Sequence, residues 1–456
     1  MKLAERTDTL TAPRIVRSIM DRRGTMLSTE DVEDWLAERR AAHRFRVDRI
    51  PFDELRGWSF AQDTGNLRHE SGRFFTVEGL HVTAEEEQIT EWEQPIIRQP
   101  EVGILGILVK EFDGVPHFLM QAKMEPGNPN LLQLSPTVQA TRSNYTGAHR
   151  GSRVKYIDYF THPARGSVLA DVIQSEHGSW FFQKGNRNMI VEAKGDVPAD
   201  DDFRWLTLGQ LGELMHRDNL LNMDSRTVLS CAPFGGNEPQ ALHSDSEVVS
   251  WITSQRATRQ LRVDRIPLKN VRNWTRNSMS IEHEADRFFR VVAVSVQAES
   301  REVGSWTQPL FEPVGRGVTA FLTRRIGGVT HMLAHAKAEG GIIQSMELGP
   351  TIHCVPANYD HLPRERRPLF LDLVLEADAS RIRYETIHSE EGGRFLNAES
   401  RYMFVEATEE EAPTNPPPGY RWVTAGQLTA LTQHGNYVNV QARTLLACHR
   451  FALQNV

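Results

Sequence analysis

The segment from Gln133 to Gly151, QLSPTVQATRSNYTGAHRG, is dense in side chains that could do chemistry, yet it follows an apolar, strand-like run. It contains two arginines, a histidine and a tyrosine. Arginines can bind a diphosphate bidentately, and histidine and tyrosine can transfer protons. Ser135, Thr137 and Ser143 could instead cap helices and close turns. Structural, phosphate-binding and catalytic interpretations all stay open, and the last two together suggest a nucleotide-linked substrate.

A weaker copy of this segment, ELGPTIHCVPANYDHLPRE, begins 214 residues later at Glu347. VDRIP occurs at 47–51 and again at 263–267, and further matches in the same order run from Trp35/Trp251 to Cys231/Cys448. Such ordered self-similarity predicts a tandem duplication of a module of roughly 200 residues. We expect an N-terminal extension (1–27), a first repeat (28–232), a Gly- and Pro-rich linker (233–243) and a second repeat (244–456).

Each repeat is predicted to be an α+β module, a mixed sheet with flanking helices. Ser28-x-x-Asp31 and Ser244-x-x-Glu247 are typical of capped helix starts. Asp113-Gly114, between two apolar runs, indicates a tight hairpin. A second hairpin is expected within 168–193, and each repeat closes with helical sequence. The polar segment lies between the two hairpins, which predicts a loop or short helix above the sheet.

Comparison of the copies separates shared from unshared polar residues. Arg142 aligns with Pro356, His149 with Pro363 and Gln139 with His353, so the second copy has lost an arginine and a histidine. If one copy does chemistry, the first is the better candidate. The shared pairs predict a common ligand-binding plan or scaffold: Lys123/Lys337, Thr137/Thr351, Asn144/Asn358, Tyr145/Tyr359, Glu176/Glu390 and Arg187/Arg401.

Composition and missing motifs exclude several functions. The net charge of −7 argues against nucleic-acid binding, and no apolar run approaches the roughly 20 residues of a membrane span. The three cysteines lack metal-ligand or disulfide spacing, which favours a reducing cytoplasm. No Walker A, G-x-G-x-x-G, G-x-S-x-G or H-E-x-x-H sequence occurs. We therefore expect neither a metal nor a nicotinamide or flavin cofactor.

The motif QLSPTVQATRSNY, supported by GPTIHCVPANY, RVDRIPF, GRFF and RYMFVEA, resembles the NDP-hexose 2,3-dehydratase family of deoxysugar biosynthesis over nearly the whole chain. One departure is His353, where the family's second copy usually has glutamine. The resemblance implies tandem Nudix-like domains in a homodimer. It also implies a dTDP-linked 4-keto-6-deoxyhexose substrate and a product captured by an NADPH-dependent 3-ketoreductase. The Nudix catalytic signature, a glycine followed by R-E-x-x-E-E, is absent.

The implied reaction removes the C3 proton, acidified by the C4 ketone, and then expels the C2 hydroxyl as water. It needs a base near C3, a donor at O4 and an acid near O2. We assign Tyr145 or His149 to proton transfer, Lys123 to O4, and Glu176 to acid or base chemistry. Substrate-binding candidates are Arg142, Arg150 and Arg187 for the diphosphate, with Gln139, Asn144 and Thr137 for orientation. The second pocket would contain Lys337, Thr351, His353, Asn358, Tyr359, Glu390 and Arg401.

Two alternatives remain. A protein with two nucleotide-sugar pockets and no chemistry would be a binding or regulatory protein. A Nudix-type nucleoside-diphosphate hydrolase is the other possibility, although the chain lacks that family's acidic helix motif.

Overall fold

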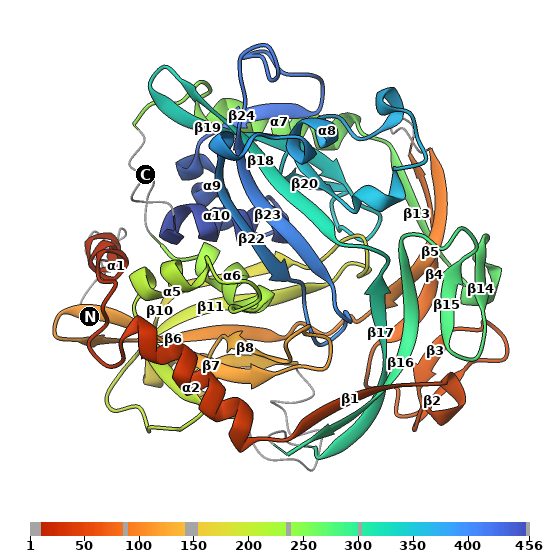
Figure 1. The fold of residues 1–456 in the computed structure, drawn as a ribbon, viewed down its shortest axis with the longest axis horizontal. Helices are drawn as coiled ribbons and strands as arrows, with labels where there is room; N and C mark the ends of the chain where they lie inside the picture. Colours follow the sequence, from red (N-terminus) through yellow and green to blue (C-terminus); the bar gives the residue numbers. More distant parts are fainter. Residues whose placement is uncertain (1–10, 85–89, 142–153, 234–238, 300–302, 453–456) are drawn as a thin grey trace, which may run out of the picture.

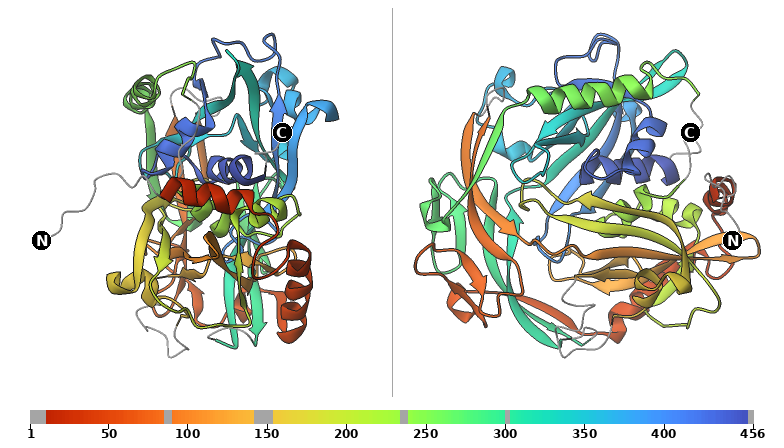
Figure 2. Two further views of the ribbon diagram at one scale, coloured as in Figure 1. Left: turned by 90° about the vertical axis from the view of Figure 1, so that its left-hand side faces the viewer. Right: turned by 180° about the vertical axis from the view of Figure 1, so that it is seen from behind.

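A computed structural model of the protein describes residues 11–84, 90–141, 154–233, 239–299 and 303–452. Figures 1 and 2 show the two larger sheets on either side of a central group of helices, and the two smaller, curved sheets together at one edge of the molecule. The predicted α+β class is confirmed, with most elements being strands. No helix in the described ranges combines the length and apolar character needed to cross a bilayer.

The N-terminal helix α1 (Thr11–Met20) packs on the first repeat. That repeat comprises α2 (Thr29–Ala42), β1 (Phe45–Ile50), η1 (Phe52–Glu54), β2 (Trp58–Phe60), β3 (Leu67–His69), β4 (Thr76–Ala84), β5 (Glu91–Arg98), β6 (Ile104–Phe112), β7 (Val115–Met124), β8 (Leu132–Ser135), β9 (Val138–Ala140), α4 (Asp158–Thr161), η2 (Pro163–Arg165), β10 (Gly166–Ser175), β11 (Gly185–Ala193), β12 (Phe203–Leu206), α5 (Leu208–Leu214) and α6 (Met223–Ser230).

The second repeat follows nearly the same order. It comprises α7 (Asp245–Thr258), β13 (Leu261–Ile266), η3 (Leu268–Asn270), β14 (Trp274–Arg276), β15 (Ser280–His283), β16 (Phe289–Ala298), β17 (Ser305–Pro313), β18 (Gly317–Ile326), β19 (Val329–Ala338), β20 (Met346–Gly349), β21 (Ile352–Cys354), η4 (Pro356–Asn358), η5 (Arg364–Arg366), α8 (Leu371–Leu375), η6 (Ala379–Arg381), β22 (Ile382–Ser389), β23 (Glu399–Glu406), β24 (Tyr420–Val423), α9 (Ala425–Thr432) and α10 (Val440–Ala452).

The larger sheet of each repeat has seven strands and is mixed, as predicted. Its order in the first repeat is β10-β11-β6-β7-β12, with β8 on β7 and β9 on β6. β11 runs parallel to β6, whereas the hairpin neighbours β6/β7 and β10/β11 are antiparallel. The Asp113-Gly114 turn has φ of 50° and 78°, which a two-residue hairpin of this hand requires.

The smaller five-stranded sheets exchange strands between the repeats. β1 of the first repeat pairs with β16 of the second, and β13 of the second pairs with β4 of the first. These exchanged strands carry the duplicated VDRIP sequence. Each small sheet therefore needs both repeats for its completion (Figure 1).

Local expectations are met at most helix starts and in the core. Ser244 and Glu247 form the full reciprocal capping box. Ser28 accepts a hydrogen bond from the Asp31 amide and donates to the Asp31 carboxylate. Trp35 and Trp58 are buried, as their retention in both copies suggests.

The loop or short helix predicted for the polar segment was wrong for its first half. Residues 132–135 and 138–140 form strands β8 and β9, so the first half of the polar segment belongs to the sheet and not to a loop above it. The physical reason is alternation: Leu132 and Leu134 enter the core beneath α6, and Val138 enters the core on the opposite side of the sheet. The polar residues between them also have partners: Gln133 accepts from Ser389, Ser135 accepts from Asn222, and Thr137 donates to the Leu119 carbonyl.

Candidate active site

The first site begins at the end of β7. The Nζ atom of Lys123 lies 3.7 Å from Oε1 of Glu125, and both side chains are buried. Gln139 on β9 donates from Nε2 to the same Oε1 at 2.8 Å. The Oε1 atom of Gln139 accepts from Nδ2 of Asn222, the N-cap of α6, at 3.3 Å. Two predicted residues, Lys123 and Gln139, are therefore brought together around Glu125.

Glu176 enters the same site from the end of β10. It is buried, and its Oε1 accepts a hydrogen bond of 2.7 Å from Nδ2 of Asn186. The Gly103 amide in turn donates to Oδ1 of Asn186 at 3.0 Å, which fixes the orientation of the amide group. Glu176 is thus held by one neutral donor, and no cation within the described residues pairs with it.

Two further carboxyl groups, Asp224 and Glu391, adjoin these residues. Burial raises the pKa of Asp224 well above its usual value, and the negative charges of Glu176, Glu391 and Glu125 raise it further. Burial also raises the pKa of Glu391 to about 7, with Arg394 opposing and the two glutamates adding to the effect. The site therefore contains carboxyl groups that hold protons near neutral pH.

Four oxygens of this cluster are buried without a hydrogen-bond partner among the described residues. They are Oε2 of Glu125, Oε2 of Glu176, Oδ1 of Asp224 and Oε2 of Glu391. An unsatisfied buried acceptor costs about 1–3 kcal/mol, so such groups are retained where a ligand or a proton uses them. Lys184, whose pKa burial lowers to about 8, and Arg394 supply positive charge nearby.

Glu391 and Arg394 come from the second repeat. Their loop, residues 390–397, lies on the turn after β7: the Gly127 amide donates to the Gly392 carbonyl at 2.7 Å, and the Asn397 amide donates to the Gly127 carbonyl at 2.8 Å. The reverse contact repeats the pattern, with Gly341 donating to Gly178 at 2.7 Å. Each site is therefore completed by a loop of the other repeat.

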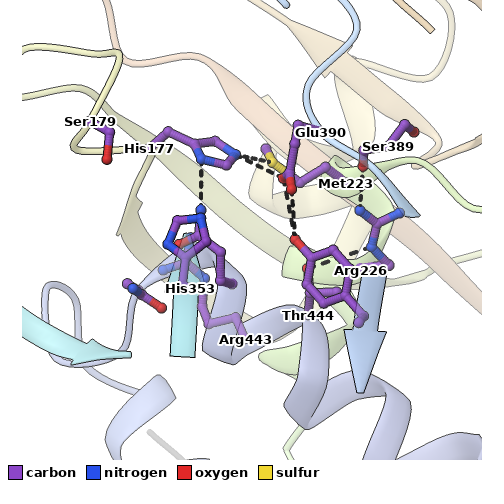
Figure 3. A network of polar contacts seen from close by, with 12 residues as sticks. His177, Ser179, Met223, Arg226, His353, Ser389, Glu390, Arg443 and Thr444 are labelled. Carbon is purple, nitrogen blue, oxygen red and sulfur yellow. Dashed lines mark hydrogen bonds and ion pairs between the residues drawn. The ribbon is translucent and has the colours of Figure 1, made fainter. Parts of the chain in front are cut away.

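The second site differs in its charge balance (Figure 3). Its buried glutamate, Glu390, forms an ion pair of 3.0 Å with His177 and accepts from the Tyr402 hydroxyl at 3.0 Å. Gln441 Nε2 lies 2.7 Å from the other ring nitrogen of His177. Burial opposes protonation of His177, but Glu390 outweighs it and raises the pKa of that imidazole.

The lysine and the other glutamate of the second site are also paired, whereas Oε1 of Gln441 is buried without a partner among the described residues. Nζ of Lys337 lies 3.0 Å from Nδ1 of His353 and donates to the His353 carbonyl at 2.7 Å. Ser179 donates to Glu339 at 2.6 Å. Burial and the charge of Lys337 lower the pKa of His353 well below its usual value. Within the described chain, neither Glu339 nor Glu390 has a buried oxygen without a partner.

The other predicted residues have different surroundings. Thr137 accepts from the Leu108 amide at 2.9 Å and donates to the Leu119 carbonyl, which ties β6 to β7, and Thr351 does the same in the second repeat. Arg187 bonds to Asp171 across β10 and β11.

Several residues predicted for the second pocket also make contacts that hold the fold together. Arg401 bonds to Glu385 across β22 and β23, repeating the arrangement of Arg187. Asn358 accepts from the Phe288 amide at 3.0 Å, and Tyr359 packs against the second repeat's core. Five predicted residues lie outside the described residues: Arg142, Asn144, Tyr145, His149 and Arg150.

Among the described residues, one cluster of side chains outside the first site is close enough together to bind a metal ion. Ligand atoms of His81, Glu91 and Glu93 lie within 4.8 Å of one another. Arg272 already pairs with both glutamates, at 2.5 and 2.7 Å, so a cation occupies the position that a metal would need. The carboxyl groups of the first site do not converge in this way.

Asp224, Glu391 and Arg394 were not among the site residues predicted from the sequence. A signal was present, because these residues align with Gln441, His177 and Trp180 and so differ between the copies. The same kind of difference between the copies singles out Arg142 and His149 within the polar segment.

The fold and site define a duplicated α+β protein with a buried acid–base cluster that spans its repeats. The family model for NDP-hexose 2,3-dehydratase matches residues 29–232 and 245–449. The chain belongs to this family, a class of carbon–oxygen lyases, and the predicted resemblance is confirmed.

Three relatives bear the name dTDP-4-dehydro-6-deoxy-alpha-D-glucopyranose 2,3-dehydratase. One from Amycolatopsis orientalis is 59% identical over 96% of this chain and 93% of its own length. One from Saccharopolyspora spinosa is 50% identical over 95% and 94%. One from Streptomyces violaceoruber is 49% identical over 91% and 96%.

Proposed function

We propose that this protein dehydrates a dTDP-linked 4-keto-6-deoxyglucose across C2 and C3, and that the first site carries the reaction. The names of the relatives support the substrate. The observation that carries the choice of site is the contrast in pairing. Among the described residues, one buried carboxyl oxygen of Glu125 and one of Glu176 have no partner, whereas Glu390 is neutralised by His177.

The proposed reaction uses no redox cofactor. A base removes the proton at C3, and Lys123 stabilises the enolate that forms at O4. The C2–O bond then breaks, the hydroxyl takes a proton and leaves as water, and the enol tautomerises to a 3,4-diketo-2,6-dideoxy sugar. Burial and a single neutral donor support Glu176 as an acid or base. Tyr145 and His149 remain proposals for the proton-transfer pair.

The second site is proposed to bind without reaction. Its lysine is engaged by His353 and its glutamate by His177, so the groups that would act on a keto-sugar already have partners. We further propose that the repeats descend from a Nudix-like module, that the protein is a homodimer, and that an NADPH-dependent 3-ketoreductase consumes the reactive diketone.

The first test is incubation with dTDP-4-keto-6-deoxyglucose in deuterated buffer, with a 3-ketoreductase and NADPH as the trap. We expect a product that lacks the C2 hydroxyl and carries solvent deuterium at C2, detected by mass spectrometry. Unchanged substrate, where a control dehydratase reacts, would contradict the proposal. Tight binding without turnover would instead favour a nucleotide-sugar-binding protein.

The residue assignments are tested by Tyr145→Phe, His149→Ala and Glu176→Gln. Loss of a sole general acid or base lowers turnover by roughly 10²–10⁴-fold. Near-normal turnover in all three variants would refute the assignment, provided that each binds dTDP as the wild type does.

A further inference from the structure

The loop of residues 390–397 brings an ionisable side chain of the second repeat into the first site. Backbone bonds between Gly127, Gly392 and Asn397 hold this loop against the turn after β7. The Gly393 amide donates to Oε1 of Glu391 at 3.0 Å, which leaves Oε2 buried without a partner among the described residues. Glu391 is therefore fixed through one oxygen and available through the other.

The charged surroundings of Glu391 come from several elements. Arg394 lies on its own loop, Glu125 follows β7, Glu176 follows β10, Lys184 precedes β11, and Asp224 is in α6. Glu125, Glu176 and Asp224 are each at least nine-tenths buried and each has an oxygen without a partner in the described ranges. Burial, together with repulsion among these carboxyl groups, raises the pKa of Asp224 and of Glu391, so at least one of the two retains its proton near neutral pH.

The counterpart of Glu391 in the second site is His177. His177 is committed to an ion pair with Glu390, so this position has become a permanent partner of the glutamate there. In the first site the same position holds a second carboxyl group, which cannot neutralise Glu176. Where the second site has the His177–Glu390 ion pair, the first site has two carboxyl groups, Glu391 and Glu176. Two neighbouring acids are suited to proton transfer but do not stabilise each other.

We propose that Glu391, supplied by the second repeat, is the general acid that protonates the departing C2 hydroxyl in the first site. This role rests on the proposed dehydratase function. The enolate electrons form the C2=C3 double bond and restore the C4 carbonyl, and the C2–O electron pair stays with oxygen. That oxygen takes the proton from the Glu391 carboxyl group and leaves as water. Glu391 becomes a carboxylate and recovers its proton from solvent.

The expected pH dependence of kcat follows from the raised pKa of Glu391. A general acid must be protonated, and burial raises the pKa of Glu391 to about 7. Wild-type kcat should therefore fall as pH rises through that region. A Glu391→Gln variant has no such group, so its residual rate should lack this limb.

The experiment compares wild type, Glu391→Gln and the exposed control Glu410→Gln for dehydration and for exchange of the substrate C3 proton with deuterated solvent. We expect Glu391→Gln to lose roughly 10²–10⁴-fold in kcat, to bind dTDP normally, and to keep C3 exchange, because proton removal precedes the acid step. Glu391→Asp, which keeps a carboxyl group, should restore part of the rate.

The contrary outcomes are distinct. Turnover by Glu391→Gln within threefold of wild type, with the alkaline limb intact, would overturn the inference alone. Loss of C3 exchange together with turnover, at normal dTDP binding, would also overturn it by making Glu391 the base. A wild-type protein that neither exchanges nor dehydrates would overturn the proposed function and this inference with it.

Discussion

At the scale of single residues, the two sites differ in how buried charge is neutralised. Glu390 and His177 form a closed pair, whereas Glu176 faces Asn186 and further carboxyl groups. Removal of one partner from a buried ion pair leaves an unpaired charge that costs stability, whereas a carboxyl group that has no cation partner can exchange protons. This contrast predicts that substitution of an ionisable residue mainly lowers stability in the second site and mainly lowers turnover in the first.

His177→Gln should lower the free energy of unfolding by roughly 3–5 kcal/mol, because it leaves Glu390 buried without its cation. Since the pKa of His177 is raised from 6.5, its stabilisation is complete below pH 6.5 and is lost as pH rises through the folded-state value. The pKa of Glu390 is lowered from 4.5 despite its burial, because of His177, so its stabilisation is complete above pH 4.5.

Urea unfolding of wild type and His177→Gln should therefore differ most between about pH 4.5 and 6.5 and less at pH 9. The exposed His162→Gln serves as the control. A difference that stays constant across this range would show that the loss comes from packing and not from the ion pair.

At the scale of elements, the loops that cross between the repeats depend on close backbone contact. A Cβ atom at Gly127 would lie 1.7 Å from the Phe395 carbonyl oxygen, and one at Gly341 would lie 1.8 Å from that of Phe181. Neither contact can be relieved by turning a side chain. Glycine is required at both positions for this reason, and each loop is placed by it.

Gly127→Ala should displace the loop that carries Glu391 and Arg394. A shift of about 1 Å at a catalytic group can cost roughly 100-fold in rate, so we expect a loss of that order in kcat. Gly341→Ala introduces the matching clash at the second site. Both variants should lose similar thermal stability, and only a larger loss of kcat in Gly127→Ala agrees with catalysis at the first site.

At the scale of the whole molecule, the repeats are interlocked and do not form two independent domains. Strands β1 and β13 are exchanged between the small sheets, and α6 packs on α10 at the centre (Figure 2). Two buried arginines also connect the repeats. Arg226 of the first repeat donates to the Ser389 carbonyl of the second, and Arg443 of the second donates to the Ser175 carbonyl of the first, both at 2.6 Å. Neither half has a complete small sheet or a complete site alone.

Cleavage of the connection should therefore not separate the repeats. A protease site inserted between Pro239 and Gln240, which are both exposed, allows the test on folded protein. We expect the two fragments to co-elute at the size of the uncut chain and to retain turnover. Elution as two smaller species without denaturant would contradict the interlocked arrangement.

The sequence by itself determined the duplication, the α+β class, the hairpins and the family, because these depend on repeated patterns and local periodicity. Three residues predicted from the sequence, Lys123, Glu176 and Gln139, lie on or next to strands of one repeat, and their roles stay predictions. The sequence did not reveal that β8 and β9 continue the sheet, because short polar strands are set by partners distant in the chain.

Only the tertiary structure decided how the repeats share their sites. Strand exchange and the crossing loops bring Glu391 within electrostatic influence of Glu176, although 215 positions separate them in the sequence. The pairing of His177 with Glu390 depends on the same exchange. Whether a buried carboxyl group is neutralised depends on which charges surround it in space, and here those charges come from both repeats.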